Sequence, residues 1–283
     1  MLKRLARFAA LLVVAWLAFL ASCQHRLIYF PRPYRSGVPE VFCKKGGVAV
    51  ETRTASGRQV SWLLKPKDGT PERLWIVCGG NGALALEMED IASFGSSRDA
   101  YLFFEYPAYG RCEGKPSPRT IRESLRTTIP AAAGLCGIPA SDLPDKGLVF
   151  GHSLGAAVGL MGAEEFGIRK VVLVSPFTST MDMASVMTHL PLGWLVWHRF
   201  DNRAGLRGLQ QRGGHAWIIH GADDEAIPVR MGRTLAGEFP QTVTFREIPE
   251  GHHNDLFDLA PQAITEAMAS ARDAVTPPAA PKP

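Results

Sequence analysis

The sequence predicts an α/β fold with a mostly parallel central sheet, helices on both faces of the sheet and a short cap insertion. Two observations lead to this fold class. Short, almost wholly apolar runs recur along the chain, and they alternate with longer segments of helical character. Strands buried on both faces of a parallel sheet have this composition, and the alternation is typical of βαβ units. The composition of the 283 residues, 46% of them hydrophobic, is that of an ordinary globular protein.

The elements follow in chain order. Segments 48–54 and 60–65 alternate and flank Ser56-Gly57, which predicts an antiparallel hairpin. The apolar runs predict strands at 74–78, 101–104, 147–150, 171–174, 217–219 and 243–248. Helices are predicted at 84–94, 120–133, 154–166, 229–238 and 255–271. Because ligands bind such sheets beyond the carboxyl ends of the strands, we expect the functional residues directly after the apolar runs.

The domain is predicted to cover residues 27–272, with the cap at about 176–213 and a disordered Pro/Ala-rich tail at 273–283. Within the cap, residues 190–200 (LPLGWLVWHRF) are rich in Leu and Trp. One interpretation is a helix packed on the core. The other is an apolar wall for an acyl chain, or a surface that rests on lipid.

The first residues differ from the rest of the chain. Lys3, Arg4 and Arg7 precede an uncharged apolar run at 8–21, which is shorter than the roughly 20 residues that span a bilayer. The run ends in Leu20-Ala21-Ser22-Cys23, which resembles a bacterial lipobox. The resemblance implies a signal peptide over residues 1–22 and lipidation of Cys23. The alternatives are an uncleaved anchor and a plain secretory signal cut near Ser22.

The lipobox resemblance also implies a location. Gln24 stands where many lipoproteins retained at the inner membrane have aspartate. We therefore expect a lipid-anchored protein of the cell envelope, at the outer membrane or on the periplasmic side. Cleavage would remove Lys3, Arg4 and Arg7 and lower the net charge from +4 to +1. No basic block remains, so no nucleic-acid partner is expected.

Four cysteines remain besides Cys23. In an oxidising compartment they could form one or two disulfides, and the alternative is small buried thiols. Neither Cys-x-x-Cys nor His-Glu-x-x-His occurs, so no metal site is predicted. The four are Cys43, Cys78, Cys112 and Cys136.

A nucleophile is predicted at Ser153. The sequence Gly151-His152-Ser153-Leu154-Gly155 follows a predicted strand and opens a predicted helix. This is Gly-x-Ser-x-Gly in the strand–turn–helix setting where it forms a nucleophile elbow. The alternative is a tight structural turn that contains a serine. We interpret the neighbouring His152 as structural.

A serine nucleophile requires a base and a carboxylate, which in this arrangement follow it in the order Asp/Glu and then His. Asp223, Asp224 and Glu225 follow the strand at 217–219, and Pro228 is expected in the first turn of the next helix. The last strand is followed by two adjacent histidines, 252 and 253, and by Asn254 or Asp255 as a helix cap. Spacing alone leaves the choice of acid and base open.

Two backbone N–H groups are expected to bind an oxyanion. One belongs to Leu154, the residue after the nucleophile, and the other to the loop after the strand at 74–78. That loop reads Cys-Gly-Gly-Asn-Gly, which favours Asn81 as the second donor, with an adjacent residue as the alternative.

Three motifs resemble the α/β-hydrolases, in particular the small-cap, membrane-associated lipid and acyl-protein hydrolases. Residues 220–228 resemble His-Gly-x-x-Asp-x-x-x-Pro, residues 251–255 resemble Gly-x-His-Asn-Asp, and residues 106–114 resemble Tyr-x-x-Tyr-Gly-x-Ser-Glu-Gly. The resemblance implies Asp224 as the acid and His253 as the base, with Asp223 and His252 as alternatives. The sequence departs from the pattern at Glu105, where Asp is usual, and at Cys112, where Ser is usual.

These residues predict a serine hydrolase that cleaves an ester or thioester through an acyl-serine intermediate, without a cofactor. The expected partners are a small-molecule or lipid-like acyl substrate and, through the N-terminal anchor, a membrane. A peptidase or amidase on the same fold is an alternative, as is a surface lipoprotein that binds without catalysis. Transfer of the acyl group to an acceptor other than water stays open, as does the oligomeric state.

Overall fold

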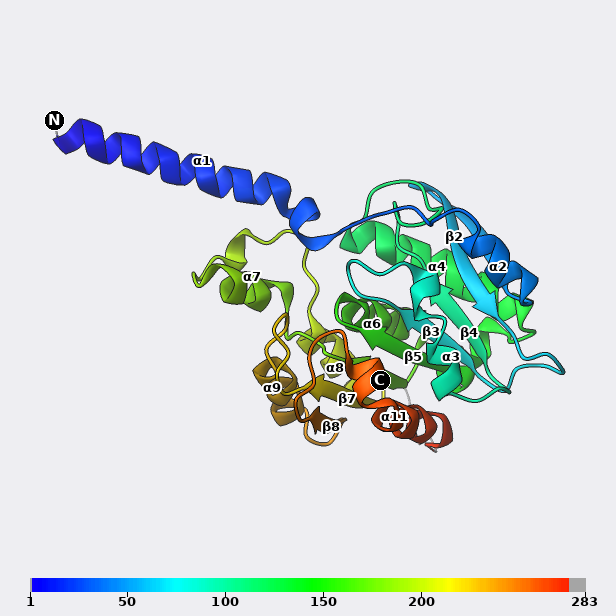
Figure 1. Ribbon diagram of the computed structural model, residues 1–283. Helices are drawn as coiled ribbons and strands as arrows, with labels where there is room; N and C mark the ends of the chain where they lie inside the picture. Colours follow the sequence, from blue (N-terminus) through cyan, green and yellow to red (C-terminus); the bar gives the residue numbers. More distant parts are fainter. Residues whose placement is uncertain (1, 275–283) are drawn as a thin grey trace.

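A single eight-stranded sheet forms the centre of the computed structural model, which describes residues 2–274 (Figure 1). The strand order is β1-β2-β4-β3-β5-β6-β7-β8. β2 is antiparallel to β1 and to β4, and all other neighbours are parallel. The strands are β1 (Val48–Thr54), β2 (Gly57–Leu64), β3 (Leu74–Cys78), β4 (Ala100–Phe104), β5 (Gly147–His152), β6 (Lys170–Val174), β7 (His215–Gly221) and β8 (Val243–Ile248).

Helices cover both faces of the sheet. α4, α6, α8 and α9 contribute to the apolar core on one face, and α3, α10 and α11 to the core on the other. The α-helices are α1 (Leu2–Ile28), α2 (Val38–Lys44), α3 (Ile91–Phe94), α4 (Pro118–Leu135), α5 (Leu143–Lys146), α6 (Leu154–Phe166), α7 (Thr180–Thr188), α8 (Asn202–Gln211), α9 (Arg230–Glu238), α10 (Leu256–Leu259) and α11 (Pro261–Asp273). Short 3₁₀ helices are η1 (Ala85–Met88), η2 (Ala140–Asp142) and η3 (Gly193–Leu195).

The local sequence explains these elements. Every residue of β3, β4, β5 and β6 is buried, as the apolar runs predict for strands covered by helices on both faces. α4 begins after Ser117, whose side chain accepts a hydrogen bond from the Thr120 N–H at 3.1 Å, and Pro118 occupies its first position. The predicted α/β fold class is confirmed.

Two predicted helices are each divided in the structure. The helix predicted at 255–271 is α10 followed by α11, because Pro261 cannot donate an N–H to a continuous helix and Ala260 has a non-helical backbone. The helix predicted at 84–94 is η1 followed by α3, and the Ala85 N–H donates to the side chain of Glu105. This hydrogen bond anchors the first residue of η1 to the residue that follows β4.

Two predicted helix starts are also corrected. Pro228 precedes α9, whose first residue is Arg230, and its carbonyl accepts from the Met231 N–H. Asp255 precedes α10, yet its side chain accepts from the His252 N–H at 2.8 Å and caps no helical N–H. Both residues stabilise the turns that lead into the helices.

The sequence left open whether the cysteines form disulfides or remain thiols, and the structure shows thiols. All five cysteines fall within the described residues, and each is a free thiol. Cys78 is buried within β3, where it faces helix α6, and Cys136 is buried at the end of α4. Cys43 is exposed, and Cys23 and Cys112 are half-buried, so the interpretation as buried thiols fits Cys78 and Cys136 only.

The cap segment at 190–200 is not a helix packed on the core. It contains only the short turn η3, and the side chains of Trp194 and Trp197 are 62% and 72% exposed. Val196 and Phe200 point inward and are buried. The segment is therefore apolar both toward the protein and toward the solvent.

The N-terminal helix α1 extends away from the rest of the molecule (Figure 1). Leu5, Phe8, Leu11 and Phe19 are exposed along it. Within residues 2–274, no helix combines the length and the apolarity that crossing a membrane requires. The predicted tail lies outside the described residues from position 275 onward.

Candidate active site

Ser153 occupies the sharp turn between β5 and α6. Its backbone has φ 57° and ψ −119°, a conformation that residues other than glycine rarely adopt. Such strain persists only where the surrounding structure enforces it. Here the Ser153 N–H donates to the Val174 carbonyl of β6 at 2.9 Å. The turn directs the side chain into a cleft at the carboxyl ends of the strands.

The two glycines of the motif make room for this turn. A Cβ atom on Gly155 would lie 2.0 Å from the Cys78 carbonyl oxygen, and one on Gly151 would lie 2.4 Å from the Gly155 carbonyl oxygen. The start of α6 therefore packs directly against the end of β3. This contact brings the nucleophile turn close to the loop that follows β3.

A chain of hydrogen bonds joins Ser153, His253 and Asp224. The Ser153 Oγ atom lies 3.1 Å from His253 Nε2, and His253 Nδ1 lies 2.8 Å from Asp224 Oδ2. The loops after β5, β7 and β8 supply the three residues. With its proton on Nδ1, the imidazole presents Nε2 as the acceptor for the serine hydroxyl.

Asp224 is buried and held as a carboxylate. Burial alone would raise its pKa, but hydrogen bonds from His220 and His253 and from the Ile227 N–H lower the pKa well below its ordinary value. The Ala226 N–H donates to the same carboxylate at 3.0 Å. Asp224 therefore orients the imidazole of His253.

The alternative acid and base lie elsewhere. Asp223 is exposed, and its N–H donates to the Gly251 carbonyl. His252 is exposed and lies 3.3 Å from Glu225, which raises the pKa of the imidazole. The structure thus brings Asp224 and His253, and not their neighbours, to Ser153.

Both expected oxyanion donors line the cleft beside Ser153. Leu154 is the first residue of α6, so its N–H has no acceptor within the helix. Among residues 2–274, no protein acceptor pairs with the Asn81 N–H. Gly80, the residue before Asn81, lies next to the serine, since a Cβ atom on Gly80 would lie 3.5 Å from Ser153 Cβ. The site can thus stabilise a negative charge that develops next to the serine.

His152 supports the base, a role that sequence reasoning left as merely structural. Its Nε2 atom donates to the His253 carbonyl at 3.1 Å, and its ring centroid lies 5.0 Å from that of His253. Burial and the neighbouring His253 lower the pKa of His152 to about 4. A neutral His152 therefore fixes the backbone of the base without adding a charge.

His220 supports the acid, and sequence reasoning gave it no role. Its side chain is fully buried, and Nε2 lies 2.8 Å from the Ile227 carbonyl and 3.3 Å from Asp224 Oδ2. A Cβ atom on Gly232 would lie 2.6 Å from His220 Nδ1, so a glycine in α9 makes the space for this ring. The first residue of the motif at 220–228 was the signal that could have found it.

The cleft has a volume of about 780 Å³ and adjoins a smaller, mainly apolar pocket of about 160 Å³. The two share five lining residues. The smaller pocket reaches beneath α7 and η3. The shared residues are Leu27, Ile28, Thr180, Met183 and Met187.

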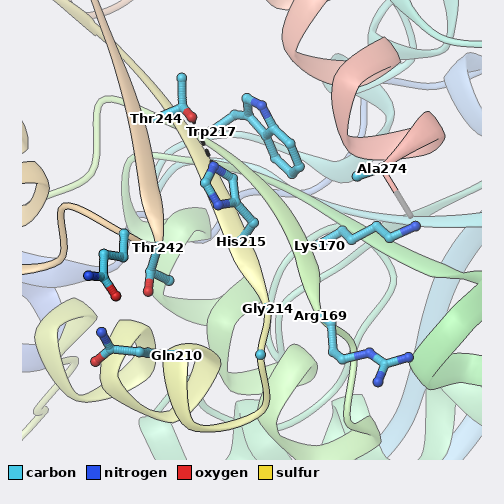
Figure 2. A pocket seen from close by; sticks show the side chains of 11 residues that line it. Arg169, Lys170, Gln210, Gly214, His215, Trp217, Thr242, Thr244 and Ala274 are labelled. Atoms are coloured by element: carbon cyan, nitrogen blue, oxygen red, sulfur yellow. Dashed lines mark hydrogen bonds between the residues drawn. The ribbon is translucent and has the colours of Figure 1, made fainter. Parts of the chain in front are cut away.

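A third cavity, of about 550 Å³, lies at the amino ends of β6 and β7 (Figure 2). It is lined by Lys170, His215 and Thr244, among other residues. The His215 Nε2 atom lies 2.9 Å from Thr244 Oγ1. None of the predicted site residues reaches this cavity. The candidate active site is therefore the cleft at the opposite ends of the strands.

Comparison with known proteins gives relatives over most of the chain. No family model matches the sequence. An uncharacterized protein of Mycobacterium tuberculosis is 28% identical over 264 residues, which cover 90% of each chain. Alpha/beta hydrolase domain-containing protein 17B of Homo sapiens is 24% identical over 210 residues, 72% of this chain and 68% of the relative.

Solved structures resemble the whole domain. An alpha-beta hydrolase from Vibrio vulnificus has a TM-score of 0.65 at 17% identity and covers 83% of this chain and 88% of its own. An esterase from Pyrococcus furiosus has a TM-score of 0.63 at 16% identity. The match covers 87% of this chain and 98% of the esterase. The strand order, the nucleophile turn and these likenesses agree: the chain has the α/β-hydrolase fold.

Proposed function

We propose that this protein is a serine hydrolase that cleaves an ester or thioester through an acyl-serine intermediate. The observation that carries the proposal is the hydrogen-bonded chain from Ser153 through His253 to the buried Asp224 carboxylate. Two backbone N–H groups beside the serine complete the machinery of acyl transfer. The similar proteins, which are named as an esterase and as alpha/beta hydrolases, support the same class of reaction.

The proposed reaction proceeds in two halves. The Ser153 hydroxyl attacks the carbonyl carbon while His253 Nε2 takes its proton, and the Leu154 and Asn81 N–H groups bind the oxyanion. When the tetrahedral intermediate collapses, His253 returns the proton to the departing alcohol or thiol, which leaves an acyl-serine. Water then attacks, again with His253 as the base, and releases the carboxylic acid. Asp224 stays ionised throughout and orients His253.

We infer that the acyl group occupies the apolar side of the cleft. Leu27, Ile28, Met183 and Met187 line both the cleft and the apolar pocket that adjoins it. Burial of each methylene of an acyl chain contributes about 0.8 kcal/mol, and methionine side chains adapt to chains of different shape. A lipid-like acyl substrate fits this lining.

We also propose that the protein is anchored in the cell envelope by lipid attached to Cys23. The lipobox resemblance at 20–23 motivates this proposal. It is supported by the position of Cys23 near the end of α1, directly before Gln24, whose side chain bonds to the cap. An acyl anchor there would hold the cleft near a membrane surface.

The acyl-serine can be tested with a series of p-nitrophenyl esters, from acetyl to lauroyl. We expect the parent to hydrolyse several of them and Ser153→Ala to lose at least about a thousandfold in kcat. Ser270→Ala, on the exposed side of α11, serves as the matched control. Rapid quenching and mass spectrometry should find the acyl group on the peptide that contains Ser153. Hydrolysis that survives in Ser153→Ala would contradict the proposal.

A further inference from the structure

The last residues of α1 and the segment that follows them contact the loop that carries the second oxyanion donor. We call residues 24–32 the N-terminal strap and residues 79–82 the oxyanion loop. Three of the four loop residues are glycines, so the loop has little conformational preference of its own. Contacts from outside the loop must therefore determine where the Asn81 N–H points.

The strap holds the oxyanion loop through three hydrogen bonds. The Asn81 side-chain amide donates to the Ile28 carbonyl at 2.9 Å. The Phe30 N–H donates to the Asn81 carbonyl at 3.2 Å, and Arg32 Nε donates to the Gly82 carbonyl at 3.2 Å. The strap thus fixes the loop at and after Asn81.

Two buried tyrosines also bond to the oxyanion loop. The Tyr106 hydroxyl donates to the Gly79 carbonyl, and the Tyr109 hydroxyl donates to the Asn81 carbonyl. Tyr109 also accepts the Phe30 N–H at 2.8 Å, so it joins strap and loop. The side chains of both tyrosines are almost fully buried.

These bonds bracket the peptide group that carries the proposed donor. The Asn81 N–H belongs to the peptide group between Gly80 and Asn81. The peptide groups before and after it are fixed through the carbonyls of Gly79 and Asn81. Because peptide groups are planar, anchoring both neighbours limits the rotation of the group between them.

The other end of the strap is bonded to the cap. The Gln24 side chain donates to the Leu195 carbonyl at 2.5 Å and accepts from the Trp197 N–H at 2.7 Å. The Tyr29 hydroxyl lies 3.1 Å from His198 Nδ1. One continuous segment therefore ties the cap to the oxyanion loop.

We propose that Tyr109 and the N-terminal strap are positioning elements that aim the Asn81 N–H at the oxyanion of the transition state. The proposal rests on the proposed acyl-serine reaction and adds residues that act on it through Asn81. A donor helps catalysis only where it meets the oxyanion at hydrogen-bond distance, and small displacements are costly. Loss of one of these contacts should therefore slow the chemical step more than it weakens substrate binding.

Two variants of the full-length protein test this role. Tyr109→Phe removes the hydroxyl that joins strap and loop, and Asn81→Ala removes the side-chain bond to Ile28 while the Asn81 N–H stays in place. Tyr101→Phe is the matched control, because this buried tyrosine hydroxyl also donates to a backbone carbonyl, that of Ser96, but at the amino end of β4. Tyr109→Phe loses two hydrogen bonds, to the Asn81 carbonyl and from the Phe30 N–H, and each of the other two variants loses one.

We expect kcat for p-nitrophenyl butyrate to fall about tenfold in Tyr109→Phe and in Asn81→Ala, with KM within about twofold of the parent. The inhibition constant of a trifluoromethyl ketone, whose serine adduct carries an oxyanion, should rise by about the same factor. Tyr101→Phe should leave both quantities unchanged.

Unchanged kcat in both folded variants, with an active parent, would overturn the positioning role and leave the proposed hydrolase intact. An equal loss in Tyr101→Phe would overturn it too, because the effect would then be one of general stability. A parent that hydrolyses no ester would overturn the proposed function itself. If Tyr109→Phe does not fold, Asn81→Ala decides alone, since Asn81 is only half-buried.

Discussion

Three buried histidines surround the Asp224 carboxylate and Ser153, and each has a different role. His253 bonds to both, His220 donates to Asp224, and His152 donates to the backbone of His253. The two supporting rings bond to backbone carbonyls as well as to the site, so they cannot rotate without losing a buried hydrogen bond. The arrangement of the proposed base and acid thus depends on two histidines that make no hydrogen bond to Ser153.

Glu105 is the residue whose ionisation should dominate the pH dependence of stability. Burial raises its pKa to about 8, although hydrogen bonds from Tyr34 and from the Ala85 N–H oppose this. In the unfolded chain the pKa is about 4.3. Between these values the folded protein keeps a proton that the unfolded chain has released, so stability should fall as the pH rises from about 4 to about 8.

The variant Glu105→Gln tests this dependence, because the amide stays neutral at every pH. We expect urea unfolding of the parent to give a smaller free energy at about pH 8 than at about pH 5, and Glu105→Gln to flatten that difference. Glu51→Gln, which removes an exposed carboxylate, should behave like the parent. A Glu105→Gln protein with the full pH dependence of the parent would show that another group is responsible.

At the scale of elements, the β5–α6 turn determines where the nucleophile lies. Gly155 sits against the end of β3, where a methyl group would lie 2.0 Å from the Cys78 carbonyl oxygen. We predict that Gly155→Ala lowers the free energy of unfolding by about 3 kcal/mol or more, because backbone atoms must move to admit the methyl group.

The matched control is Gly134→Ala in α4, where a Cβ atom would meet nothing within 4 Å. Alanine in a helix is favoured over glycine by about 1 kcal/mol, so this variant should be as stable as the parent or slightly more so. Urea unfolding followed by circular dichroism measures both. Equal stability of the two variants would mean that α6 can move away from β3 without cost.

The same elements indicate how far the sequence could predict the site. The nucleophile turn could be predicted because strand, glycines and serine are contiguous in the chain. The order of the loops after β5, β7 and β8 limited the acid to three adjacent residues and the base to two adjacent histidines. The motif resemblance favoured the acid and the base that the structure brings to Ser153. The division of α10 from α11 follows from Pro261, which was visible in the sequence but was not used.

The strap could not be predicted in this way. Its bonds to the oxyanion loop involve backbone carbonyl and N–H groups, which almost every residue has. They also join positions far apart in the sequence: Ile28 and Asn81 are 53 residues apart. The exposed tryptophans of the cap are a related case. An apolar segment can pack on the core or face outward, and only the arrangement of α7 and η3 decides which.

At the scale of the whole molecule, the anchor proposed at Cys23 lies directly before the strap. Gln24, the next residue, is bonded to the cap, so the proposed lipid would be attached beside the cleft. We predict that the protein expressed in a bacterium that processes lipoproteins incorporates labelled palmitate and sediments with membranes. Cys23→Ala should lose the label, while Cys43→Ala, at an exposed thiol, should keep it. Label retained by Cys23→Ala would contradict the anchor.

The strand order of the sheet places all parts of the candidate site at one edge. It brings the ends of β3, β5, β7 and β8 to this edge, so four loops distant in sequence carry the proposed oxyanion donor, nucleophile, acid and base. The central claim is that these four loops form one working catalytic unit.

Reaction with a fluorophosphonate probe tests that claim most directly, because the probe labels only a serine that a working base has activated. The folded parent should be labelled within minutes, Ser153→Ala should show no label, and His253→Ala and Asp224→Asn should react at least about a hundredfold more slowly. A folded parent that takes up no label, or a Ser153→Ala protein that is labelled as fast as the parent, would contradict the account.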